Sequence, residues 1–283
     1  MFGNDFGIPA MTEAQRRRIG AYIEGEFGIK MPASKKSLLE GRLAKRLRAT
    51  GSRSYDEYFD LVTKAPGDPD EYLHFIDLIS THETSFFREP KHFQLLASSL
   101  LPALCADRGR RSISVMSAAC STGEEAWTLA MLVDDALETY RRRDMGFTVE
   151  GFDISTKALG VARRGVYLDG RTKSIPMDLQ RNYLMASKDR SKGLRRFIPE
   201  LRACVSFHEG NLLGDLGLNR KYYDIVFCRN VLIYFDQARQ REVISTLLRR
   251  MNPGSYLFLG HSETMQSFGF PIRSIAHAAY QKS

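Results

Sequence analysis

Few cysteines, no long apolar run and too few glycines for a phosphate-binding loop characterise this 283-residue sequence. The four cysteines lack C-x-x-C spacing, which argues against a zinc site or a disulfide framework, so we expect reduced thiols and no bound metal. No apolar run approaches the roughly 20 residues of a membrane-spanning helix. The stretch Met1–Ala10 lacks the pattern of a secretory signal. We therefore expect a cytoplasmic protein that does not insert into a membrane.

The segment from Ser112 to Trp127 carries the most information. An apolar stretch leads into a turn of small residues, which let backbone amides and a helix N-terminus approach a ligand closely. Gly123 stands alone where a dinucleotide-binding loop would need three glycines, so no pyrophosphate cradle is indicated. Glu124 and Glu125 would repel phosphate and attract a cationic amine. The turn therefore predicts a nucleotide-type cofactor that has an amine and no phosphates.

Two kinds of pattern divide the chain. Apolar residues at helical spacing, with capping residues, predict four helices at 12–27, 34–48, 54–63 and 70–79. From residue 112 onward apolar and helical segments alternate, which is typical of a mainly parallel α/β sheet with helices on both faces. We therefore predict a small helical N-terminal domain, residues 1–87 with its linker, and a second domain, residues 88–283.

Within the second domain we expect strands at 113–118, 149–152, 205–208, 224–228 and 256–260, and helices at 125–140, 157–164 and 237–251. Pro253-Gly254 is expected to separate the last helix from its strand. The closing stretches 272–275 and 278–280 predict an antiparallel hairpin at the sheet edge. Basic residues interrupt the alternation between Ser187 and Glu200, which indicates a small inserted β subdomain at about 187–207.

Polar side chains follow the predicted strands at the ends where α/β sheets bind ligands. Asp153 ends the second strand, where an acid often accepts hydrogen bonds from ribose hydroxyls, and Ser155 is the better N-cap for the next helix. Arg229 and Asn230 end the fourth strand, and burying a charged arginine there is costly unless it faces a ligand. After the third strand, Asn211 could face an adenine ring or serve only as a turn residue.

Six motifs occur in one order along the chain: Thr84-Ser-Phe-Phe-Arg-Glu, Ser117-Ala-Ala-Cys-Ser-Thr-Gly-Glu-Glu, Phe152-Asp-Ile, Asn211-Leu-Leu, Phe227-Cys-Arg-Asn-Val-Leu-Ile-Tyr-Phe-Asp and Gly260-His-Ser-Glu. Together they resemble the CheR family of chemoreceptor glutamate methyltransferases. Each motif is a weak match alone, and jointly they are strong. The resemblance extends from about residue 12 to the C-terminus.

The resemblance implies S-adenosylmethionine as methyl donor, S-adenosylhomocysteine as product, and a Rossmann-like methyltransferase sheet behind a helical domain that helps to recognise the receptor. It implies that Arg88 and Tyr234 lie near the reacting centre. It places around the cofactor Thr84, Arg88, Glu125, Asp153, Asn211, Leu212, Arg229 and Asn230. The chain departs from the family at His82, where many members have Asn. It also departs at Ala126-Trp127, where Pro and Tyr are usual, which should alter packing rather than chemistry.

Basic charge is concentrated near the N-terminus. The net charge is +8, and residues 11–50 hold ten Lys/Arg and four Asp/Glu, a balance of +6 (10 − 4). The second predicted helix resembles the family's receptor-facing helix. We therefore expect Lys35, Arg42, Lys45 and Arg48 to contact the cytoplasmic domain of a methyl-accepting chemoreceptor, with a merely solvated face as the alternative.

Two other functions fit parts of the sequence. A nucleic-acid methyltransferase would explain the basic helix and the cofactor fold, but no aromatic platform is interleaved with the basic residues. A non-catalytic receptor-binding adaptor would keep the fold without methyl transfer. We expect a monomeric glutamate O-methyltransferase with no nucleic-acid partner. The sequence leaves open whether the insertion docks a receptor tail peptide by strand addition.

Overall fold

The computed structural model describes residues 10–64, 67–214, 216, 222–265 and 268–283. All of the stretch Met1–Ala10 except its last residue therefore lies outside the described residues. Backbone contacts divide the chain into two units. The first comprises residues up to Thr81 together with Tyr234–Arg239, and the second comprises His82–Ile233 and Gln240–Ser283. Among the residues that the structure describes, no helix combines the length and apolarity that a bilayer crossing requires.

The first unit contains the four helices predicted from the sequence: α1 (Glu13–Phe27), α2 (Lys36–Thr50), α3 (Tyr55–Thr63) and α4 (Pro69–Ile79). Local chemistry sets their ends. Thr12 and Gln15 form a reciprocal capping box before α1, and Gly28 ends it in the left-handed conformation with φ 71°. A short 3₁₀ turn, Ala33–Lys35, precedes α2. The apolar side of α2 is buried through Leu39, Leu43 and Leu47, which lie at four-residue steps.

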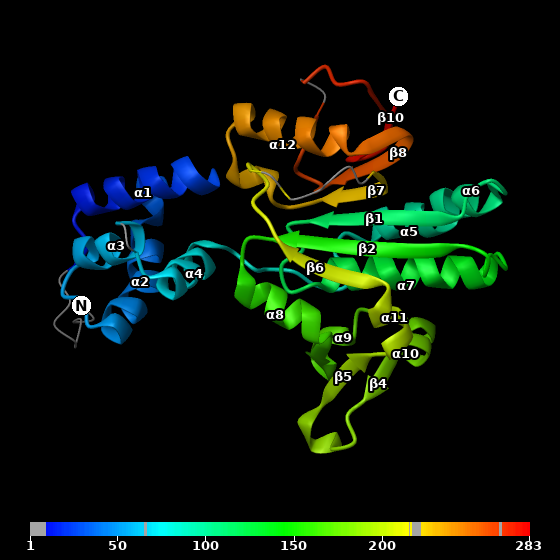
Figure 1. The fold of residues 1–283 in the computed structure, drawn as a ribbon, viewed down its shortest axis with the longest axis horizontal. Coiled ribbons are helices and arrows are strands. Elements are labelled where there is room, and N and C mark those ends of the chain that lie inside the picture. The colour runs from blue at the N-terminus through cyan, green and yellow to red at the C-terminus, as the bar shows by residue number, and fades with distance from the viewer. Residues whose placement is uncertain (1–9, 65–66, 215, 217–221, 266–267) are drawn as a thin grey trace. The chain divides into compact units, whose positions relative to one another are not determined.

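The second unit is built on a seven-stranded sheet with the order β6-β2-β1-β7-β8-β10-β9 (Figure 1). The five strands β1 (Ser112–Ala118), β2 (Gly146–Asp153), β6 (Val205–Glu209), β7 (Tyr223–Cys228) and β8 (Met251–Leu259) run parallel. The closing hairpin, β9 (Ile272–Ala276) and β10 (Ala279–Lys282), pairs antiparallel at the edge, which confirms that prediction.

Three helices connect the parallel strands: α7 (Glu124–Thr139), α8 (Thr156–Arg164) and α12 (Gln237–Arg249). Helix α7 packs against β1 and β2, and α8 packs against β2 and β6. This strand–helix alternation brings the carboxyl ends of β1, β2 and β7 to one edge of the sheet, where ligands bind in such folds.

Prolines misled the sequence interpretation at two places. Pro253-Gly254 was expected to precede the last parallel strand, but it lies inside β8. The register between β8 and β7 shifts between Tyr223 and Ile225, so this part of β8 does not have to continue the hydrogen-bonded ladder. The stretch 90–106 was not predicted as helix, yet it forms α5 (Pro90–Leu95), a π-turn (Leu96–Leu100) and α6 (Leu101–Ala106). Its two prolines sit in first turns, which require no backbone N–H donor.

The inserted subdomain begins at Val166 rather than at Ser187. Its antiparallel sheet has the order β3-β5-β4, formed by β3 (Val166–Leu168), β5 (Leu194–Phe197) and β4 (Leu184–Ala186). The elements α9 (Asp169–Thr172), α10 (Met177–Tyr183), a 3₁₀ turn (Arg190–Lys192) and α11 (Pro199–Ala203) complete it, whereas 205–209 is β6 of the main sheet. Strands of three or four residues are too short to produce a periodic pattern, which explains the late boundary.

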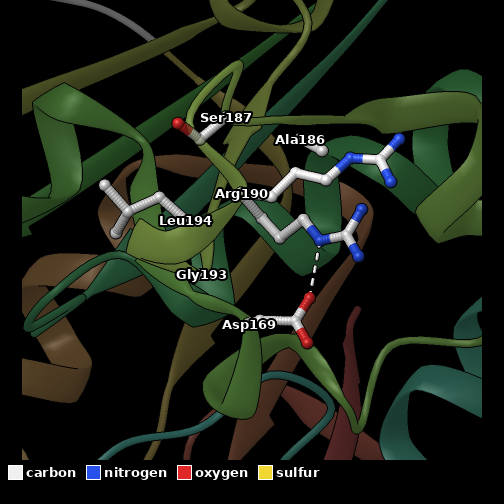
Figure 2. Close-up of a pocket in the computed structure, with 7 residues that line it drawn as sticks. Asp169, Ala186, Ser187, Arg190, Gly193 and Leu194 are labelled. Atoms are coloured by element: carbon white, nitrogen blue, oxygen red, sulfur yellow. Dashed lines mark hydrogen bonds and ion pairs between the residues drawn. The ribbon is translucent and has the colours of Figure 1, made fainter.

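The insertion contains a pocket of about 360 Å³, shown in Figure 2. Arg195 of β5 pairs with Asp169 of α9 across it, with 2.6 Å between Nε and Oδ1. Arg190, Gly193 and Leu194 complete much of its lining.

Trp127, the one tryptophan of the chain, joins helix α7 to α8 and to the insertion. Its exposed fraction is 1%, and its ring stacks on Phe197 with 4.5 Å between centroids. The indole Nε1 donates to the Ala162 carbonyl at 3.2 Å. Trp127 therefore serves packing in this chain.

We expect Trp127→Phe to lower the free energy of unfolding by about 1–3 kcal/mol, because it leaves a small cavity and removes a buried hydrogen bond. Urea unfolding followed by circular dichroism measures the change. Tyr140→Phe is the matched control at the exposed end of the same helix, where the change should stay within about 0.5 kcal/mol. An unchanged midpoint for Trp127→Phe would remove the packing role.

Candidate functional site

Strained backbone marks the carboxyl ends of the central strands. Among the described residues, seven non-glycine residues have positive φ, and five of them lie near this edge: Phe87, Glu89, Ala119, Ser121 and Asn230. Such conformations persist only where surrounding structure enforces them, and they gather at functional sites. The edge also carries most of the residues that the sequence singled out.

The turn between β1 and α7 is held from both sides. The Cys120 N–H donates to the Phe152 carbonyl at 2.9 Å, which ties the turn to the end of β2. Gly123 has φ 94°, and a Cβ there would lie 2.7 Å from Cβ of Ala162. The Tyr167 hydroxyl donates to the Thr122 carbonyl at 2.7 Å. A glycine is therefore required for close approach to α8, and not for a phosphate cradle.

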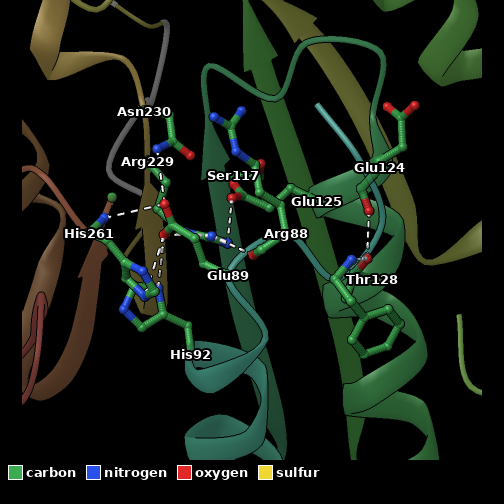
Figure 3. A network of polar contacts seen from close by, with 12 residues as sticks. Arg88, Glu89, His92, Ser117, Glu124, Glu125, Thr128, Arg229, Asn230 and His261 are labelled. Atoms are coloured by element: carbon green, nitrogen blue, oxygen red, sulfur yellow. Dashed lines mark hydrogen bonds and ion pairs between the residues drawn. The ribbon is translucent and has the colours of Figure 1, made fainter. Parts of the chain in front are cut away.

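The adjacent residues Glu124 and Glu125 point in different directions and have different neighbours, as Figure 3 shows. Glu125 accepts from the Ser117 hydroxyl at 2.7 Å and lies 3.3 Å from Nη1 of Arg229. Burial raises the pKa of Glu125, and the Arg229 charge opposes that rise. Glu124 is fully buried and pairs with Thr122 and Arg171 instead. The expectation that both glutamates attract one amine is therefore wrong for Glu124, because successive helical residues do not face the same side.

Asp153 occupies the predicted place at the end of β2. Its Oδ2 accepts from the Ser121 N–H at 2.7 Å and its Oδ1 from the Ser155 N–H at 2.9 Å. Burial raises the pKa of Asp153, and these two backbone donors oppose the rise. Ser155 caps α8 through its hydroxyl, as predicted. A carboxylate has about four acceptor sites, so Asp153 keeps acceptor capacity for a ligand hydroxyl beside its backbone donors.

Of the buried polar atoms without a hydrogen-bond partner, two lie beside Asp153: Oγ of Ser121 and Nε2 of His82. The imidazole of His82 lies close enough to Asp153 to act on its pKa, in the downward direction. Unpaired buried polar atoms are rare in folded proteins and indicate a missing partner. Here they border a carboxylate that is itself able to accept further hydrogen bonds.

Glu89 organises the other side of the site, although the sequence analysis gave it no role (Figure 3). It lies 2.8 Å from Nη2 of Arg229 and accepts from Nδ2 of Asn230 at 3.1 Å and from the His261 N–H at 3.3 Å. Burial alone would raise the pKa of Glu89, but these donors outweigh burial and lower it to about 2. The signal that could have found it is a charged residue inside the Phe-Phe-Arg-Glu motif.

Glu89, His92 and His261 are the one group in the described part of the chain whose atoms could hold a metal ion, with ligand atoms within 4.8 Å of one another. The Arg229 guanidinium already pairs with Glu89 there. A fixed positive charge on the same carboxylate opposes a second cation. Burial also lowers the pKa of His92 to about 4, so its imidazole is neutral at pH 7.

The structure brings together most of the predicted cofactor residues. Arg229 contacts both Glu125 and the Arg88 carbonyl, and Asn230 lies next to it. The Gly210 N–H donates to the Asp153 carbonyl at 3.0 Å, which sets the turn carrying Asn211 and Leu212 beside the end of β2. In that turn Oδ1 of Asn211 accepts from the Leu213 N–H, and Leu212 is buried. The Thr84 carbonyl accepts from Arg171 at 3.4 Å.

The remaining predicted residues belong to the first unit. Tyr234 is grouped there, with Nζ of Lys35 at 5.7 Å from its ring centroid. Nη1 of Arg42 donates to the carbonyls of Leu78, Ile79 and Ser80, which end α4. Arg42 therefore caps a helix. Lys45 and Arg48 are exposed.

Comparison with known proteins gives consistent matches. The all-alpha domain of CheR methyltransferases matches residues 14–80, and their S-adenosylmethionine-binding domain matches residues 82–277. A chemotaxis protein methyltransferase of Borreliella burgdorferi is 32% identical over 276 residues, which cover 96% of this chain and 95% of that protein. A chemotaxis protein methyltransferase of Escherichia coli is 37% identical over 255 residues, 90% of this chain and 85% of the relative. Chemotaxis protein methyltransferase 2 of Pseudomonas aeruginosa is 34% identical over 253 residues, 89% and 87% of the two chains.

The Glu89 network predicts a pH-dependent contribution to stability. Glu89→Gln should lower the free energy of unfolding by about 3 kcal/mol at pH 7, because the buried Arg229 loses an ionic partner. The folded-state pKa of Glu89, about 2, lies below its unfolded value of about 4.3, so the contribution is complete above the unfolded pKa and disappears as pH falls toward 2.

Urea unfolding between pH 7 and pH 3 measures this difference. Glu83→Gln is the control, because that side chain is exposed and should show no such trend. A difference between Glu89→Gln and the native chain that stays constant with pH would contradict the assigned ionic role.

Proposed function

Because the chain belongs to the CheR methyltransferase family, we propose that it transfers a methyl group from S-adenosylmethionine to glutamate side chains in the cytoplasmic domain of a chemoreceptor. The products are a glutamyl methyl ester and S-adenosylhomocysteine. The observation that carries the proposal is the half-buried carboxylate of Glu125, which accepts from the Ser117 hydroxyl at the carboxyl end of β1. A monomer acting in the cytoplasm is part of this proposal.

The residues at the strand ends fit this cofactor. Asp153 has acceptor capacity for ribose hydroxyls, and the unpaired atoms of Ser121 and His82 border it. Glu125 offers a negative charge for the ammonium group of the donor. Leu212 is apolar and Asn211 polar, a pair suited to the face and the edge of an adenine ring. The donor has no phosphate, and the turn between β1 and α7 has Gly123 as its single glycine.

The donor, when bound, supplies a sulfonium-activated methyl group. A substrate glutamate has a reference pKa near 4.3, so it is ionised at pH 7 and the chain needs no general base to generate the nucleophile. The transfer brings an anion and a cation together and neutralises both, so water opposes it and an aligned, desolvated site favours it. The task of this chain is therefore to orient two groups and exclude water.

We assign the orientation of the substrate carboxylate to Arg88 and Tyr234. Nη1 of Arg88 donates to the Glu83 carbonyl at 2.6 Å, which tethers the side chain and leaves other N–H groups for a glancing contact. A firm bidentate clamp would instead lower the nucleophilicity of the carboxylate. Arg229 has a different place: its exposed fraction is 5%, and its two Nη groups donate to Glu89, Glu125 and the Arg88 carbonyl.

For receptor binding we propose the exposed Lys45 and Arg48 of α2, which offer positive charge to an acidic surface. Arg42 and Lys35 are half-buried, and Arg42 already holds the end of α4. Their contribution to a partner would therefore be indirect, through the placement of the helices.

The function is tested by incubating the chain with methyl-labelled S-adenosylmethionine and candidate receptor cytoplasmic domains. We expect label in the receptor that alkali releases as methanol, as a methyl ester requires. Alkali-stable label would indicate methylation of nitrogen or carbon, and label in added RNA or DNA would indicate a nucleic-acid substrate. Cofactor binding without transfer to any receptor would indicate an adaptor. Each of these three outcomes contradicts the proposal.

A second prediction concerns the charge of Glu125. Glu125→Gln should weaken binding of S-adenosylhomocysteine roughly 10- to 100-fold at pH 8, the loss of one charge-assisted hydrogen bond. Burial raises the pKa of Glu125, so this side chain should take up a proton at a higher pH than an ordinary glutamate does. The affinity of the native chain should therefore begin to fall at that higher pH when the solution is acidified. The variant should lack that dependence.

Isothermal titration calorimetry from pH 8 to pH 5 measures both effects. Glu138→Gln is the matched control, since its side chain is exposed near the end of the same helix. Equal pH profiles for the native chain and Glu125→Gln would exclude Glu125 as the partner of the ammonium group.

A further inference from the structure

The insertion contacts two segments at this edge of the sheet through three side chains of one short stretch. One segment is the turn between β1 and α7, called the cofactor turn below, together with the start of α7, and the other is the stretch 84–86. The Tyr167 hydroxyl of β3 donates to the Thr122 carbonyl at 2.7 Å. The Ser174 hydroxyl donates to the Phe86 carbonyl at 3.0 Å. Arg171 of α9 donates to the Thr84 carbonyl at 3.4 Å and pairs with the Glu124 carboxylate. Two segments that border the cofactor site therefore take support from outside the main sheet.

Glu124 is the part of this contact with the highest electrostatic cost. Its side chain is fully buried, and burial raises its pKa, while the Thr122 hydroxyl and Arg171 oppose that rise. The charged or titratable groups that face it are Arg171 from α9, the Tyr167 phenol from β3 and the Cys120 thiol from its own turn. Arg171 is the cation among them, so its loss would leave a buried carboxylate with the Thr122 hydroxyl but without a cationic partner.

The position of Glu124 is coupled to that of Glu125 because the two residues begin helix α7. The Glu124 carbonyl accepts from the Thr128 hydroxyl at 2.7 Å, and that hydroxyl accepts from the Phe87 N–H at 3.4 Å (Figure 3). If Glu124 turned outward to reach water, the first turn of α7 would unwind. Glu125 and the Gly123 turn would move with it.

We propose that Arg171 is a positioning residue for the methyl donor. It neutralises Glu124 and holds the Thr84 carbonyl, and so fixes the turn that presents Glu125, without touching the donor itself. This inference rests on the donor site of the proposed function and not on the receptor. The Arg171 side chain is 43% exposed, so water and salt compete with the pair and the effect should be moderate.

The test is a double-mutant cycle on the full chain, with binding of S-adenosylhomocysteine as the measurement. Arg171→Met should weaken binding roughly 5- to 30-fold at pH 8. The double variant Arg171→Met/Glu124→Gln should recover most of that loss, since no buried charge remains. Arg171→Lys should recover part of it, because it keeps the charge without the planar fork.

A pH profile separates this role from a merely structural one. The ratio of native affinity to Arg171→Met affinity should shrink as pH falls, because protonated Glu124 needs no cationic partner. Taking the ratio removes the titration of Glu125, which is common to both chains. Arg195→Met is the matched control, because Arg195 pairs with Asp169 inside the insertion. Trp127 fluorescence confirms that each variant is folded.

Three results would overturn the inference: native affinity in Arg171→Met, an equal loss in the single and double variants, or a ratio independent of pH. The measurement needs no receptor, so it remains informative if receptor methylation fails. Conversely, methyl ester formation by the native chain together with any of these three results would leave the proposed function standing and remove only Arg171.

Discussion

The site depends on one buried arginine shared by two carboxylates. Glu89 lies 2.8 Å from Arg229 and has a pKa of about 2, so this pair is neutral as a unit over the whole physiological range. Glu125 lies farther away, at 3.3 Å, and its pKa is raised by burial. Glu125 is the carboxylate of this cluster that Arg229 holds less closely, so it offers an acceptor for the ammonium group of a cationic donor. A carboxylate at this position disfavours a phosphate.

Local signals in the sequence were sufficient for most of the fold. Capping residues such as Thr12, Ser54 and Ser155 gave the helix starts, and the buried parallel strands were evident as apolar runs. The predictions that were wrong concern segments whose structure depends on contacts with other parts of the chain. Pro90 and Pro253 usually end an element, but one lies in a first helical turn and the other in a bulged strand. The strands of the insertion are too short for any periodic signal.

The candidate site was predictable where a residue's position along a strand fixes its direction, as for Asp153 and Arg229. It was not predictable where pairing depends on distant segments. Glu89 is 140 residues from Arg229 in sequence. Arg171, the partner of Glu124, lies in the short helix α9, which no sequence pattern predicted. Arg42 shows the converse: its charge indicated a partner surface, and its side chain ends a neighbouring helix.

The residue Asp169 lines the pocket of the insertion, and its near neighbours in sequence, Tyr167 and Arg171, contact Thr122 and Glu124 at the cofactor turn. Any molecule that fills the pocket and displaces Arg171 would change the affinity for the methyl donor. Thermodynamic reciprocity then requires the loaded donor site to change the affinity of the pocket by the same factor. A ligand of the pocket that acts in this way would bind with different affinity to the chain with the donor site occupied and to the chain with it empty.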